Sequence, residues 1–109
     1  MKRFALTLDL KDDPQLINEY EVFHRKVWPE VLKSIKDSGI KNMEIYNMGT
    51  RLFMTMDTND DFSFEEKTNM DLANNKVQEW ENLMWKYQQK IPGSKPNEKW
   101  VLMKKIFEL

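Results

Sequence analysis

The sequence predicts an α+β fold in which strands alternate with two helical regions. Apolar and polar side chains alternate with a period of two in four segments, which is typical of half-buried strands. Between these segments, apolar residues recur three and four positions apart, which is typical of amphipathic helices. A chain of 109 residues has room for one core, so we expect residues 1–109 to form a single domain.

The first strand and the first helical region are predicted over the N-terminal third of the chain. Residues 2–10 alternate between apolar and polar side chains and should form a strand. Asp13 and Pro14 predict a helix start, since aspartate caps the first turn and proline suits the first helical position. Pro29 should kink or split this helix, because proline removes a backbone hydrogen bond. Gly39 can adopt the left-handed conformation that ends it.

A hairpin and a second helical region follow. Residues 42–48 and 51–57 alternate as strands, and Gly49-Thr50 between them is a turn signal. A short helix is expected over residues 64–72, and another from Asn75, where a capping box begins. The second of these helices should bury a stripe of four side chains: Val77, Trp80, Met84 and Tyr87.

The C-terminal part completes the pattern. Residues 92–97 contain glycine and proline and predict a loop, and residues 99–107 predict the last strand. The resulting order, β-α-β-β-α-β, is typical of ferredoxin-like folds, in which helices cover one face of the sheet. Both faces of most strands carry apolar side chains in this interpretation, so we expect the open face to mediate a homodimer.

Composition excludes several classes of function. The chain has no cysteine and one histidine, which excludes thiol catalysis, thiolate metal sites and histidine-rich metal sites. The formal charge of −1 comes from scattered charges without a basic stripe, so nothing indicates a nucleic-acid partner. The chain has neither the apolar run of roughly 20 residues that spans a membrane nor the apolar block of a signal peptide. We therefore expect a cytoplasmic protein that is not bound to a membrane.

The single histidine, His24, is the candidate acid–base group, because histidine is the side chain that titrates near neutral pH without help. Tyr20 and Trp28 lie four positions before and after it, so on one helix the three side chains would point the same way. A proton-transfer group beside a phenol and an indole suits a small sugar-like ligand. An ordinary, hydrogen-bonded core histidine is the alternative interpretation.

Three further residues are candidate ligand contacts with strong structural alternatives. Trp80 belongs to the stripe expected in the core, and Glu81 beside it has the usual features of a solvated helix residue. Tyr46 lies on a strand next to the helical region, and we expect it to face the helix-covered side of the sheet. No glycine-rich phosphate loop, nucleophile elbow or HExxH motif is present.

The motif Tyr20-xxx-His24-xxx-Trp28-Pro29-Glu30 resembles the L-rhamnose mutarotase family and its L-fucose mutarotase relatives. The resemblance extends over essentially the whole chain, including the strand around Tyr46, the helix around Trp80 and the segment 99–103. It implies a dimeric ferredoxin-like α/β barrel that interconverts the α and β anomers of a 6-deoxy-L-sugar without a cofactor or metal.

The resemblance also implies roles for individual residues. The family's proton donor falls on His24, and its sugar-binding tyrosines fall on Tyr20 and Tyr46. The family uses two consecutive tryptophans, of which only the first is present here, at Trp80, because Glu81 occupies the second position. This departure leaves the identity of the sugar open between L-rhamnose and L-fucose.

A competing class is a cofactor-free monooxygenase or a ligand-binding module of the same dimeric α/β-barrel type. The oxygenase predicts an almost wholly apolar cavity for a polycyclic substrate. The sugar enzyme predicts hydroxyl-binding groups around His24. A purely structural dimerisation domain would have no cavity there.

Overall fold

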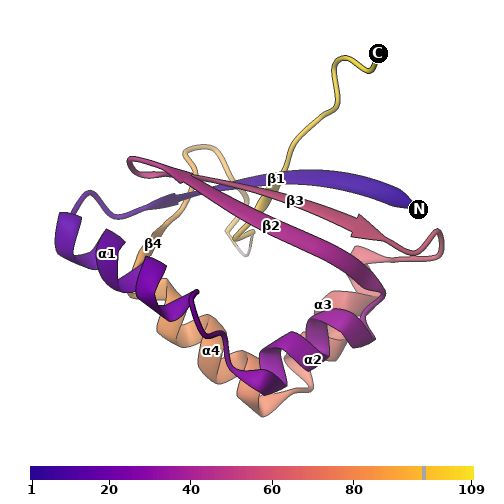
Figure 1. Cartoon of the computed structure of the whole chain (residues 1–109), viewed down its shortest axis with the longest axis horizontal. Coiled ribbons are helices and arrows are strands. Elements are labelled where there is room, and N and C mark those ends of the chain that lie inside the picture. The colour runs from indigo at the N-terminus through magenta and orange to yellow at the C-terminus, as the bar shows by residue number, and fades with distance from the viewer. Residues whose placement is uncertain (97) are drawn as a thin grey trace.

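The computed structural model describes residues 1–96 and 98–109 and has the predicted ferredoxin-like fold. Each helical region consists of two helices (Figure 1), and two short strands follow the last helix. The elements are β1 (Lys2–Leu10), α1 (Pro14–Phe23), α2 (Pro29–Asp37), β2 (Ile40–Met48), β3 (Arg51–Thr58), α3 (Phe64–Leu72), α4 (Asn75–Trp85), β4 (Gln88–Gln89) and β5 (Val101–Leu102).

The strands form one antiparallel sheet in the order β2-β3-β1-β4, with β5 also paired to β1. β1 and β3 pair along almost their whole length, from Lys2 opposite Thr58 to Asp9 opposite Arg51. β2 and β3 form the predicted hairpin, and Gly49 in its turn has a positive φ of 59°, which favours glycine. All four helices lie on one side of this sheet (Figure 1).

The core lies between the sheet and the helices. Alternation along β1 and β3 places one set of side chains on the inner face, where they are buried: Leu6, Leu8, Leu10, Leu52, Met54 and Met56. The stripe predicted for the second helical region, Val77, Trp80, Met84 and Tyr87, is buried against this face. Hydrophobic burial of this stripe fixes the side of α4 that faces the sheet.

The first helical region is split near Pro29, as predicted. The Asp13 side chain accepts hydrogen bonds from the first turn of α1, which runs from Pro14. α1 ends at Phe23, and α2 starts with Pro29 at its first position, where the absent N–H is not needed. The histidine therefore follows the end of α1 and does not lie inside a continuous helix.

The open face of the sheet is more polar than the sequence analysis predicted. Two ion pairs cross it, from Arg3 to Asp57 at 2.7 Å and from Arg51 to Asp9 at 2.5 Å. These residues occupy outward positions of β1 and β3, and the same face also carries Ala5, Thr7, Phe53 and Thr55. The prediction that both faces are apolar is therefore wrong for the two central strands.

The C-terminal part differs most from the prediction. The strand expected over residues 99–107 is limited to Val101–Leu102, and the chain then leaves the sheet (Figure 1). β4 was not predicted, because two residues show no periodicity. In α4, Asn74 caps the helix in place of the expected Asn75. The predicted loop 92–97 ends at Asn97, which lies outside the described residues. Among the described residues, no helix is long and apolar enough to span a membrane.

Candidate functional site

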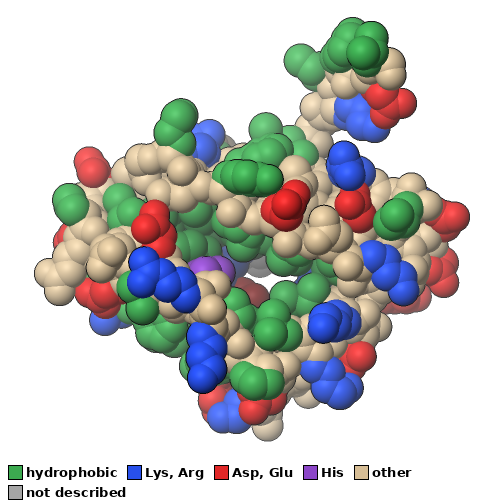
Figure 2. Space-filling view, in the orientation of Figure 1, with side chains coloured by type: hydrophobic (Ala, Val, Ile, Leu, Met, Phe, Trp, Pro, Cys, Tyr) green, Lys and Arg blue, Asp and Glu red, His purple; other side chains and the backbone are tan. Residues whose placement is uncertain are grey.

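A hollow of about 1000 Å³ lies between the inner face of the sheet and the helices. Figure 2 shows this hollow with the side chain of the chain's only histidine on its wall. Apolar side chains of β1 and β3 line one side. Polar side chains also line it, and those near the histidine and the end of α4 include Tyr20, His24, Glu81, Gln88 and Lys99. A smaller hollow of about 400 Å³ also has Tyr20 and His24 on its wall, and Ile45 and Tyr46 of β2 border it.

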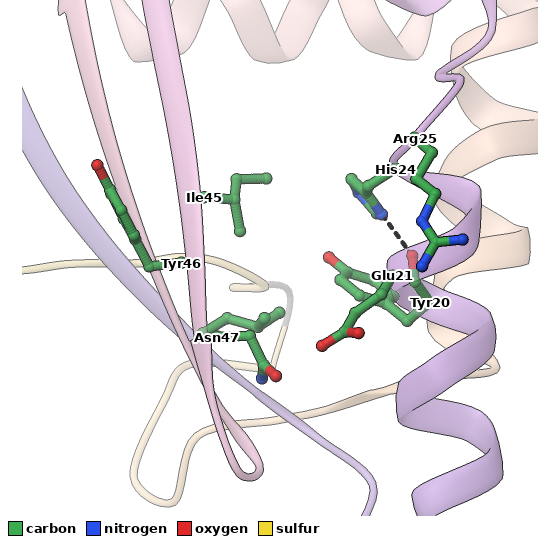
Figure 3. Close-up of a pocket in the computed structure, with 8 residues that line it drawn as sticks. Tyr20, Glu21, His24, Arg25, Ile45, Tyr46 and Asn47 are labelled. Atoms are coloured by element: carbon green, nitrogen blue, oxygen red, sulfur yellow. Dashed lines mark hydrogen bonds between the residues drawn. The ribbon is translucent and has the colours of Figure 1, made fainter.

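His24 is positioned by the end of α1. Its backbone N–H caps the helix, and its ring Nδ1 lies 2.8 Å from the carbonyl oxygen of Tyr20 (Figure 3). A carbonyl only accepts hydrogen bonds, so Nδ1 carries the proton and the neutral ring has its lone pair on Nε2. Burial lowers the pKa of His24 below its ordinary value of 6.5, against the opposing effect of this hydrogen bond. The ring is therefore neutral at pH 7 and suited to accept a proton at Nε2.

The Tyr20 phenol lies next to this imidazole. The two ring centroids are 4.3 Å apart, and the Tyr20 side chain is buried. The Gln88 amide Nε2 donates a hydrogen bond to the phenol oxygen at 3.2 Å, which leaves the phenol hydrogen available to another acceptor. Burial raises the pKa of Tyr20 to about 12, although the bond from Gln88 opposes this shift. The phenol therefore stays protonated at neutral pH.

Two tryptophans form a pair next to His24, and one of them contacts its ring. The Trp80 ring lies edge-on to the imidazole, with 5.6 Å between centroids, and Trp28 lies 5.2 Å from Trp80. Trp28 precedes α2, so the split at Pro29 turns its indole toward α4. The structure thus brings together four predicted site residues, which are Tyr20, His24, Trp28 and Trp80, although they do not share one helix.

Glu81 lies on the wall of the same hollow, and Lys99 holds it there. The Lys99 ammonium is 2.6 Å from Glu81 Oε2 and 3.3 Å from the Glu81 backbone oxygen. The ammonium also lies 4.9 Å from the centroid of the Trp85 ring. Glu81 is therefore a fixed carboxylate at the site and not a freely solvated helix residue.

Tyr46 is not on the helix-covered side of the sheet, contrary to expectation. Ile45 points toward His24, and Tyr46 points to the opposite face (Figure 3). Its ring packs against Phe53 at 6.3 Å and is 55% exposed. Neighbouring residues of a strand alternate between faces, and Ile45 takes the inward position. Within one chain, the Tyr46 ring is therefore separated from the imidazole by the sheet.

The sequence analysis missed the polar residues Gln88 and Lys99, which contact predicted site residues. Gln88 is buried in the two-residue strand β4, and its position next to the predicted stripe residue Tyr87 was the only available signal. Lys99 follows the predicted loop and precedes β5, and no local pattern indicates that its side chain lies at the site. Among the described residues, no three His, Asp or Glu side chains are grouped to hold a metal ion.

Comparison with known proteins places the chain among the sugar mutarotases, isomerases that interconvert the anomers of a free sugar. It belongs to the L-rhamnose mutarotase family, whose model matches residues 3–109.

Two relatives and one solved structure illustrate this membership. The chain is 43% identical to an L-fucose mutarotase of Xanthomonas campestris pv. campestris, covering 100% of this chain and 89% of the relative. It is 33% identical to an L-rhamnose mutarotase of Phocaeicola vulgatus, covering 88% of each chain. The crystal structure of an L-rhamnose mutarotase from Formosa agariphila shares the fold, with a TM-score of 0.74 and 20% identity over 100% of this chain and 99% of that one.

Proposed function

We propose that this isomerase interconverts the α and β anomers of a 6-deoxy-L-hexose, either L-fucose or L-rhamnose, with His24 as the acid–base group. The observation that carries the proposal is the neutral imidazole next to a phenol and an indole on the wall of an open hollow, where Nε2 has no hydrogen-bond partner among the described residues. The names of the relatives support a deoxy-sugar substrate, and the fixed tautomer supports proton transfer at Nε2.

The proposed reaction begins with proton transfer from the anomeric hydroxyl of the sugar to His24 Nε2. The bond between C1 and the ring oxygen breaks, and the ring oxygen takes the proton of the Tyr20 hydroxyl. The Gln88 amide hydrogen bond stabilises the phenolate while it exists. Rotation about C1–C2 turns the aldehyde, and the ring oxygen attacks its other face. Both protons then return, so the enzyme ends unchanged. Positioned proton transfer of this kind accelerates reactions by typically 10²–10⁴-fold.

In this proposal, aromatic rings bind the apolar parts of the sugar and polar groups bind its hydroxyls. Trp80, supported by Trp28 packed against it, offers its ring to the apolar side of the sugar and to its methyl group, and Tyr20 and Glu81 bind hydroxyls. Tyr46 borders the smaller hollow, but its ring points to the other face of the sheet, so this proposal gives it no contact with the sugar within one chain. The polar wall also favours a sugar over the polycyclic substrate of a cofactor-free monooxygenase, which needs an almost wholly apolar cavity.

Magnetisation-exchange NMR on L-fucose, L-rhamnose and D-glucose tests the activity directly. We expect the protein to accelerate exchange between the α and β anomeric signals of at least one 6-deoxy-L-sugar far above the rate in buffer. D-Glucose lacks the methyl group, and we expect slower exchange for it. Buffer-level exchange with all three sugars would overturn the proposed function.

We also propose that the chain forms a homodimer through its C-terminal tail. After β5 the tail points away from the body of the molecule, on the side opposite the helices (Figure 1). Ile106, Phe107 and Leu109 of this tail are largely exposed, and hydrophobic side chains gather at its end (Figure 2). Exposed apolar side chains of this kind mark an interaction site, and a second copy of the chain is a partner with which the contact is reciprocal.

Deletion of residues 104–109 should convert a dimer into a monomer, because it removes these apolar side chains. Light scattering coupled to size-exclusion chromatography would give about half the mass of the full chain. A full-length chain that is already monomeric at micromolar concentration would contradict the proposal. The control is the double variant Lys104→Gln/Glu108→Gln, which keeps the apolar side chains and the net charge of the tail. The mass of its particle in solution should equal that of the unmodified protein.

A further inference from the structure

The ion pair between Glu81 and Lys99 is built into the wall of the hollow. Lys99 approaches from the segment before β5, and its side chain is only 14% exposed. Its ammonium group contacts two oxygens of Glu81, Oε2 and the backbone oxygen, and lies over the Trp85 ring. Lys99 thus donates two hydrogen bonds to the same residue, Glu81, and these bonds hold the carboxylate in place.

The second oxygen of this carboxylate is available to a ligand. Within the described part of the chain, no hydrogen bond reaches Glu81 Oε1, and the carboxylate is 39% exposed. Glu81 follows Trp80 directly, and both line the hollow that contains His24. An ionised carboxylate only accepts hydrogen bonds, and such bonds are stronger than those between neutral groups. Oε1 therefore suits a donor, and a sugar hydroxyl is the donor that the proposed substrate offers.

We propose that Glu81 selects the substrate by accepting one hydroxyl of the sugar and that Lys99 is a positioning residue for this contact. The inference rests on the proposed function and extends it to specificity. Where the family resemblance has a second tryptophan, this chain offers a charged acceptor in place of an indole. A site that accepts a hydroxyl discriminates against the analogue that lacks it, because the acceptor is left without its partner. The enzyme would therefore require one particular hydroxyl on its sugar substrate.

The test compares L-fucose and L-rhamnose with analogues of each that lack a single hydroxyl at C2, C3 or C4. For the better substrate, we expect wild-type kcat/KM to fall about 10- to 100-fold for one analogue, as for the loss of a hydrogen bond to a charged group. In Glu81→Ala this particular penalty should disappear, while the penalties for the other analogues remain. Calorimetric titration of the same sugars gives a second readout that does not require turnover.

Lys99 variants separate positioning from simple stabilisation of the loop. Lys99→Met should raise KM about tenfold with little change in kcat, and Lys99→Arg should restore most of the affinity because it keeps the ion pair. Glu79→Gln is the matched control. Glu79 lies on the same helix and pairs with Lys76 at 3.3 Å on the surface, and neither residue lines the hollow. This control should leave both constants unchanged.

Two outcomes would contradict these proposals, and the measurements distinguish them. If the wild type exchanges the anomers but Glu81→Ala keeps the wild-type order of analogues, or if Lys99→Met changes thermal stability alone, the inference is wrong and the proposed function stands. If the wild type neither exchanges nor binds any of these sugars, the proposed function fails and the inference fails with it.

Discussion

Replacement of His24 by alanine should lower the enzyme-catalysed anomer exchange of the 6-deoxy-L-sugar by about 10²–10⁴-fold, the usual contribution of one positioned proton-transfer group. The loss corresponds to about 3–5 kcal/mol of transition-state stabilisation, since each tenfold change in rate is about 1.4 kcal/mol. Exchange spectroscopy at saturating sugar measures it. Wild-type exchange in this variant would remove the central element of the proposed mechanism.

Imidazole in solution provides the control for this variant. The space left by the His24 ring is open to the hollow, so added imidazole should restore part of the exchange in His24→Ala. The gain must exceed the effect of imidazole on the wild type and on the sugar alone. Failure of rescue in a folded variant would indicate that the ring acts through the structure of the helix end and not through its nitrogen.

The pH dependence of the wild type follows from the direction of the His24 pKa shift. Burial lowers this pKa below 6.5, so Nε2 is unprotonated at pH 7. The rate constant should be flat near neutral pH and fall as the pH decreases through the lowered pKa, because protonation removes the base. The stability of the fold should change in the same direction. As the pH falls below 6.5, His24 is protonated more readily in the unfolded chain than in the folded one, so the free energy of unfolding decreases.

The fold was predictable where periodicity is long. β1, β3 and the stripe of α4 bury the side chains that alternation and helical spacing selected, because hydrophobic burial on one face determines both patterns. Short elements carry no such signal. β4 has two residues and β5 has two, and their places are set by pairing with β1, which the local sequence does not encode.

The candidate site was predictable in part for the same reason. Tyr20 and His24 are separated by one helical turn, so their proximity follows from local geometry. Trp28 reaches Trp80 only because α2 starts in a new direction at Pro29, which a single helix would not allow. Tyr46 faces the other side because strand register, set by the hairpin with β3, decides which of two neighbouring residues points inward.

Trp80 connects the core to the proposed sugar site, and its replacement should show both roles. Its indole is 6% exposed, belongs to the main core cluster and contacts the rings of Phe23, His24 and Trp28. Trp80→Ala should lower the free energy of unfolding by about 3–5 kcal/mol, as is typical for large aromatic side chains in cores. Urea denaturation measures this loss.

Leu8→Ala separates the two roles, because Leu8 is fully buried in the same cluster but does not line the hollow. A leucine-to-alanine change in a core costs about 3–5 kcal/mol, so the two variants should unfold at similar urea concentrations. Per folded molecule, Leu8→Ala should then exchange anomers at the wild-type rate, whereas Trp80→Ala should bind sugar more weakly and exchange it more slowly. Trp80→Phe keeps an aromatic face, so its exchange rate should lie between those of Leu8→Ala and Trp80→Ala. Equal exchange by all folded variants would make Trp80 a core residue alone, and the sugar would then have to rest on another wall of the hollow.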